Sequence, residues 1–168
     1  QEHGDPQALR MRGVMYAEQG KKDLARRDHK RAIELEPNSS LAWDASCWGK
    51  LLVGDFAKAQ GDCEKAVALD PSAMASTVNL GHTWLLRGNK TKAWSGYQKA
   101  IPLLENKQEL EEGPLKDFIM FKKRGWQPKL CQTTHDWFAQ QGKDWLARKA
   151  PADELLAEAK AAEAAGYH

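Results

Sequence analysis

The chain has 168 residues, of which 42% are hydrophobic and 29% charged, which is typical of one folded domain or a short repeat array and excludes wholesale disorder. Lysine and arginine number 25 and aspartate and glutamate 23, so the net charge of +2 lacks the basic excess of most nucleic-acid-binding proteins. No apolar run approaches the roughly 20 residues that cross a bilayer.

The cysteines bear on the compartment. Cys47, Cys63 and Cys131 are too few for a disulfide framework and lack the close paired spacing of a zinc site. Their odd number favours a reducing compartment, and hence the cytoplasm. The chain begins with Gln1 and not Met, so a periplasmic or secreted chain with a processed N-terminus is the alternative.

An internal repeat of 34 residues organises the first two thirds of the chain. Gly20, Gly54 and Gly88 recur at this spacing, and the third copy replaces the expected proline with Glu105. Such a period indicates a helical repeat array. The other aligned columns are Ala25/Ala59/Ala93, Ala32/Ala66/Ala100, Gly13/Cys47/Gly81 and Pro37/Pro71.

The first copy shows why each column has its residue type. Leu9, Gly13 and Tyr16 have helical spacing and predict one face of a first helix, which Gly20 ends because glycine tolerates a left-handed conformation. A second helix follows, and small residues where the two helices meet allow close packing. Pro37 ends the second helix.

These columns resemble the tetratricopeptide repeat, a 34-residue helix–turn–helix unit. His29 and Cys63 stand where the family usually has phenylalanine, and Lys50 where it has an aromatic residue. The resemblance implies an all-α, right-handed superhelical solenoid of antiparallel helix pairs, with a concave groove that holds partner proteins. The three repeats cover about 6–39, 40–73 and 74–105, and the matching residues of the later copies are Trp43, Cys47, Gly54, Ala59, Ala66, Pro71, Leu80, Gly81, Trp84, Gly88, Ala93, Tyr97 and Ala100.

The rest of the chain predicts more helices. A polar run over 105–112 precedes a break at Gly113-Pro114, and helices are expected over 115–124 and 129–141. We interpret 106–150 as a degenerate fourth repeat or a pair of capping helices, because a solenoid end needs an atypical cap. Residues 143–149 predict a short helix or turn. Pro151 begins an Ala-rich terminal helix or tail over 151–168.

The family register predicts the groove-lining face of the first helix of each repeat. An exposed apolar strip with an aromatic anchor marks an interaction site, and Trp48 is the candidate anchor unless it packs between adjacent helices. Only Arg10 is basic at the positions of the family's carboxylate clamp, which argues against a co-chaperone of that type. The predicted partner-binding residues are Arg10, Val14, Asp44, Trp48, Leu51, Val78, Asn79, His82 and Leu85.

Two other clusters of residues are candidate functional sites. Cys131 and His135 are four residues apart and would share a helix face, as a metal pair or thiolate–imidazole couple would. Two ligands do not make a zinc site, so a small buried Cys131 with a surface His135 is the better explanation of the pattern. The basic run 122–124 beside Trp126 fits a solvated helix end better than a nucleic-acid site.

The sequence therefore predicts a non-catalytic scaffold that binds a partner peptide or helix in its groove, with no cofactor, metal, nucleic acid or membrane span. The alternatives are a chaperone for apolar segments of its substrates and an adaptor that self-assembles through the groove or the C-terminal tail. An enzyme based on Cys131 and His135 is the remote option.

Overall fold

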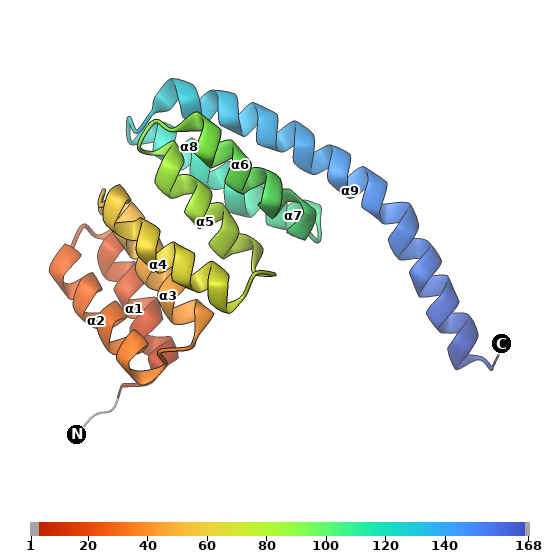
Figure 1. Cartoon of the computed structure of the whole chain (residues 1–168), viewed down its shortest axis with the longest axis horizontal. Coiled ribbons are helices and arrows are strands. Elements are labelled where there is room, and N and C mark those ends of the chain that lie inside the picture. The colour runs from red at the N-terminus through yellow and green to blue at the C-terminus, as the bar shows by residue number, and fades with distance from the viewer. Residues whose placement is uncertain (1–3, 167–168) are drawn as a thin grey trace.

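The computed structural model describes residues 4–166, and all regular elements in that range are helices (Figure 1). Three antiparallel pairs come first, and a shorter helical segment and one long helix follow. Gln1, which suggested a processed N-terminus, lies outside the described range. The last two residues of the predicted segment 151–168 also lie outside it. The paired helices are α1 (Pro6–Glu18) with α2 (Lys22–Leu35), α3 (Ser40–Leu52) with α4 (Phe56–Leu69), and α5 (Met74–Leu85) with α6 (Lys90–Ala100).

Local sequence explains where these helices begin and turn. The Asp5 carboxylate accepts a hydrogen bond from the Ala8 amide at 3.2 Å, and Pro6 follows at the first helical position. Within each pair the chain reverses at a glycine with positive φ, which is +74° at Gly20 and +85° at Gly54. Because a side chain would strain these turns, glycine repeats there every 34 residues.

The second helix pair contains a feature that the sequence interpretation missed. Cys47 on α3 and Cys63 on α4 form a disulfide, and both residues are fully buried. The two cysteines occupy the small-residue column and the usual phenylalanine column of the repeat, and these columns face each other across a helix pair. The cysteines were considered only as a possible framework, so the pairing was not predicted.

The segment after α6 contains the break that was expected at Gly113-Pro114. A short turn at Ile101–Leu103 leads to α7 (Lys107–Leu110), a wider π-helical turn at Glu111–Leu115, and α8 (Lys116–Lys123). Gly113 has a non-helical backbone (φ −99°, ψ −105°), so two helical pieces meet at a kink at the Gly-Pro pair.

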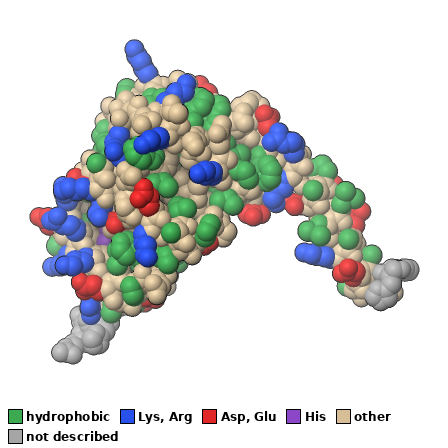
Figure 2. Space-filling view, viewed as in Figure 1, with side chains coloured by type: hydrophobic (Ala, Val, Ile, Leu, Met, Phe, Trp, Pro, Cys, Tyr) green, Lys and Arg blue, Asp and Glu red, His purple; other side chains and the backbone are tan. Residues whose placement is uncertain are grey.

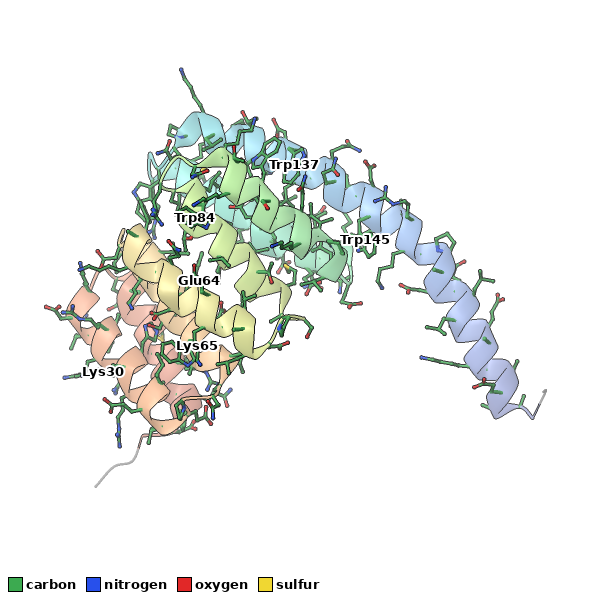
Figure 3. All side chains as sticks on the ribbon, in the orientation of Figure 1. Lys30, Glu64, Lys65, Trp84, Trp137 and Trp145 are labelled. Carbon is green, nitrogen blue, oxygen red and sulfur yellow. A yellow bond between two sulfur atoms is a disulfide. The ribbon has the colours of Figure 1, made fainter. Side chains whose placement is uncertain are left out.

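Helix α9 (Pro128–Ala164) is a single element of 37 residues, and it continues through Pro151. The prediction of three separate segments after residue 128 was therefore wrong. Trp137 and Trp145 lie on its repeat-facing side (Figure 3): Trp137 stacks on Trp94 at 4.2 Å between ring centroids, and Trp145 Nε1 donates to the Leu104 carbonyl at 3.2 Å. Residues 150–164, which we call the tail helix, are all exposed and project away from the repeats (Figure 1).

The largest core side chains lie where α5 and α6 meet α8 and α9. Tyr97, Phe118 and Phe138 are essentially fully buried, with ring centroids 5.5–5.7 Å apart. Phe121 joins them, whereas Ile119 on the same helix is exposed. Trp43 and Trp84, which occupy columns that match the repeat family, are half-buried. The C-terminal helices therefore complete the core of the third pair.

Candidate protein-binding groove

The first helices of the three pairs, α1, α3 and α5, border a hollow of about 380 Å³ that we call the central hollow. Helix α8 closes one end of it, through Asp117. Most of the lining is apolar or uncharged, with charged groups at separate points. The lining residues are Arg10, Val14, Leu41, Asp44, Ala45, Trp48, Ala75, Asn79 and Asp117.

Five of the nine predicted binding residues line this hollow: Arg10, Val14, Asp44, Trp48 and Asn79. They come from all three pairs, because the 34-residue period places equivalent positions side by side. Their role in binding remains a prediction.

The other four predicted residues are buried in the core. Leu51, His82 and Leu85 have no exposed surface and Val78 almost none. Their predicted exposure in a groove was wrong. His82 is buried because α8 packs over the third pair: the His82 ring lies 5.4 Å from Phe118 and 4.9 Å from Phe121. The open groove is therefore shorter than the repeat register implies.

Trp48 both packs against neighbouring helices and faces the hollow, the two alternatives that the sequence left open. Its ring packs 6.3 Å from Phe121 and 6.4 Å from His82, yet it is only half-buried and also lines the hollow. This packing holds the indole in place. A rigid aromatic side chain at a hollow is well suited to contact a ligand, since little conformational entropy is lost.

Charged groups at the hollow have distinct environments. Arg10 forms an ion pair with Glu36 at 3.2 Å. Asp44 accepts a hydrogen bond from Asn79 Nδ2 at 3.1 Å. Burial raises the pKa of the Asp44 carboxyl, and hydrogen bonds from Asn79 and Ser76 offset part of that increase. Asp117 accepts from the buried His82 Nε2 at 2.9 Å.

Two important lining residues were missed from the predicted set. Leu41 is 63% exposed and lies three residues before Asp44 on α3, so helical spacing alone could have placed it on this face. Asp117 had no such signal, because its position depends on how α8 docks against α5.

In the Cys131–His135 cluster, Cys131 is a buried free cysteine and His135 is half-buried. Cys131 is buried and its thiol lies 3.2 Å from the Trp126 carbonyl, while burial raises its pKa to about 11. A thiol of that kind is a poor nucleophile and metal ligand at neutral pH. His135 instead pairs with the neighbouring Asp136 at 3.0 Å.

Within residues 4–166, no three His, Cys, Asp or Glu side chains are grouped as a metal site would require. None of the helices formed by these residues has the length and apolar character needed to cross a membrane.

Comparison with known proteins supports the fold. No protein-family model and no curated protein matches the chain. A crystal structure of MamA aligns with a TM-score of 0.58 at 17% identity, over 89% of this chain and 83% of that one. A second MamA structure gives a TM-score of 0.56 at 17% identity, covering 88% and 76%.

The type III secretion translocator chaperone SycD of Yersinia enterocolitica, in an alternative dimer, is also similar. It aligns with a TM-score of 0.59 at 16% identity, over 80% of this chain and 98% of that one. At such identities the likeness concerns the fold alone. The chain is thus an all-α protein with a tetratricopeptide-like solenoid of helix pairs, and none of the three structures is described as an enzyme.

Proposed function

We propose that this protein is a non-catalytic interaction scaffold of the tetratricopeptide repeat family, with three repeats and a helical cap. It binds a peptide or helix of a partner protein in the central hollow. The observation that carries the proposal is the surface made by Val14, Leu41 and Trp48, an apolar patch with an aromatic anchor, bordered by polar groups that can orient a ligand.

A pair of leucine variants tests this proposal. Leu41 lines the hollow and is 63% exposed, whereas Leu155 lies on the tail helix and is 67% exposed. Because both side chains are exposed, Leu41→Glu and Leu155→Glu leave the fold intact and add the same charge. Peptides selected on the full chain from a display library of random sequences are then measured against each variant by fluorescence anisotropy.

The hollow is the binding site if the selected peptides bind Leu41→Glu at least about tenfold more weakly and Leu155→Glu normally, since a buried charge opposes apolar binding. Equal binding to both variants, or failure to select any peptide, contradicts the proposal. A chaperone role would use the same hollow, and it would appear as increased solubility of a co-expressed substrate that is lost with Leu41→Glu.

A second candidate function is self-association through the tail helix. Residues 150–166 are all exposed, and Leu155 and Leu156 present apolar surface that nothing in the described chain covers. Figure 2 shows hydrophobic and charged side chains mixed along the arm that projects from the body of the molecule. Sedimentation of the full chain and of residues 1–150 over a range of concentrations tests this, and equal masses for both would exclude it.

A further inference from the structure

The central hollow contains two carboxylates, Asp44 and Asp117, and neither is paired with a lysine or arginine among the described residues. Asp44 receives hydrogen bonds from the neutral side chains of Asn79 and Ser76, and it forms no ion pair within residues 4–166. The only arginine of the lining, Arg10, is engaged by Glu36. Arg10 is therefore already paired with a carboxylate outside the lining.

Asp117 is held in a similar way. Its Oδ2 bonds to His82 Nε2 at 2.9 Å, and His82 Nδ1 bonds to the Tyr97 hydroxyl at 2.7 Å. The His82 ring thus lies between the Tyr97 hydroxyl and the Asp117 carboxylate. These two contacts fix the position of Asp117 at the rim of the hollow.

The neighbouring side chains suit a cation with an apolar stem. Trp48 presents an aromatic ring to the same hollow, and such rings attract lysine and arginine side chains. Val14 and Leu41 provide apolar surface for a methylene chain. A half-buried carboxylate such as Asp44 gains more from a cationic partner than a fully solvated one does, because the local dielectric constant is lower.

We infer that the partner segment recognised by the central hollow carries an arginine or lysine flanked by apolar residues, and that its cationic group lies between Asp44 and Asp117 against Trp48. The inference rests on the proposed function. Arginine fits best, because its planar guanidinium can bond to carboxylates and stack on an indole at once.

The same charges argue against the tail helix of a second copy as the occupant. Its residues 150–166 contain four acidic side chains, Asp153, Glu154, Glu158 and Glu163, and one basic side chain, Lys160. An acidic segment would be repelled by Asp44 and Asp117. A basic segment of another protein is the complementary ligand.

The test uses peptides selected on the full chain from a random display library. In the expected result, enriched peptides share a basic residue next to apolar residues. Replacement of that residue by glutamine weakens binding at least about tenfold. Asp44→Asn preserves the oxygen that accepts from Asn79 and produces a similar loss, and Asp117→Asn is a second variant in case the first fails to fold.

The matched control is Glu64→Gln, which removes one negative charge from an exposed position on α4 outside the hollow (Figure 3). It should leave the affinity unchanged. In a double-mutant cycle, the glutamine-substituted peptide should bind the Asp44→Asn variant and the native chain with nearly the same affinity. The substituted peptide has already lost the interaction that Asp44→Asn removes.

The outcomes separate this inference from the proposed function. Peptides that lose binding on Leu41→Glu but lack a shared basic residue, or bind Asp44→Asn and Asp117→Asn as tightly as the native chain, would overturn the cation site and leave the groove function standing. Peptides indifferent to Leu41→Glu, or no selected peptides, would overturn both.

Discussion

His82 on α5 and Asp117 on α8 form a hydrogen bond of 2.9 Å that joins the third helix pair to the helix covering it. The other ring nitrogen of His82 bonds to the buried Tyr97 hydroxyl on α6 at 2.7 Å, so one imidazole connects three helices. The His82 side chain has no exposed surface. It therefore serves as a structural link, and its predicted role as an exposed groove residue is excluded in this conformation.

Replacement of His82 by alanine should lower the free energy of unfolding by about 3 kcal/mol, because it opens a cavity and leaves the buried Tyr97 hydroxyl without its partner. Tyr97→Phe should cost less, about 1–2 kcal/mol, since it removes a single hydrogen bond. Urea denaturation followed by circular dichroism measures both values. A His82→Ala variant as stable as the native chain would contradict the link.

The glycines beside His29 predict a steric effect. A Cβ at Gly13 would lie 2.4 Å from His29 Nε2, and a Cβ at Gly49 would lie 2.4 Å from Cε1 on the other side of the ring. Since the ring cannot move away from both helices, Gly13→Ala should destabilise the protein by about 1–3 kcal/mol.

Gly61 provides the matched control for that substitution. It lies within α4, and a Cβ there would meet nothing within 4 Å. Gly61→Ala should therefore stabilise the chain by about 0.5–1 kcal/mol, because alanine favours the helix. Thermal denaturation that moves in the same direction for both variants would contradict the packing around His29.

His29 should also make stability dependent on pH. Burial lowers the pKa of His29 below the usual value of 6.5, and the positive charge of Lys50 lowers it further. The Arg10 carbonyl, Asp28 and Asp62 partly offset this decrease. The buried Nε2 atom of His29 has no hydrogen-bond partner. The unfolded chain thus binds the proton more readily. Stability is complete above pH 6.5 and falls as the pH decreases below it, by at most about 1.4 kcal/mol per pH unit for one proton.

The comparison that isolates this effect is His29→Phe, which introduces the residue usual in the repeat family. This variant should lose the His29 contribution to the pH dependence and gain about 1 kcal/mol at neutral pH, because a buried polar atom without a partner is removed. Urea titrations at pH 7.5 and pH 5.5 provide the values. Equal pH dependence in both proteins would show that His29 does not titrate as described.

The Cys47–Cys63 disulfide closes a loop of 16 residues, so its reduction should lower the free energy of unfolding by about 3 kcal/mol. In air-oxidised protein denatured without reductant, thiol titration should find one thiol per chain, that of Cys131. A value of three would show that the bond does not form. Cys131→Ser should reduce the titrated value to zero.

The tail helix should contribute little to folding, since its side chains are exposed. Removal of residues 151–168 should change the free energy of unfolding by less than about 0.5 kcal/mol. Trp145→Ala, on the part of α9 that packs against the Leu104 carbonyl, should cost about 2 kcal/mol. A large loss from the truncation, measured below any self-association concentration, would indicate that the tail docks on its own chain.

Much of the repeat architecture could be predicted from local and periodic signals. The glycines at positive φ, the small residues between paired helices and the prolines after Leu35 and Leu69 each have a conformational reason that operates within one repeat. These signals predicted the helix pairs and also five of the residues that line the central hollow, because equivalent positions of stacked repeats lie on the same face.

The failures of prediction occurred where distant segments meet. Nothing in the local sequence of α8 indicates that Phe118 and Phe121 pack on His82, so the burial of His82 and Leu85 and the arrival of Asp117 in the hollow depended on tertiary packing. The disulfide depended on two columns facing each other across a helix pair. The continuity of α9 through Pro151 likewise opposed a local helix-ending signal.

The sequence by itself thus determined the repeating unit, since turn and helix-packing preferences act over short chain distances. Only the tertiary structure decided which part of the groove is open and which charges it contains. Burial and hydrogen bonding at such a site depend on side chains brought together from separate helices.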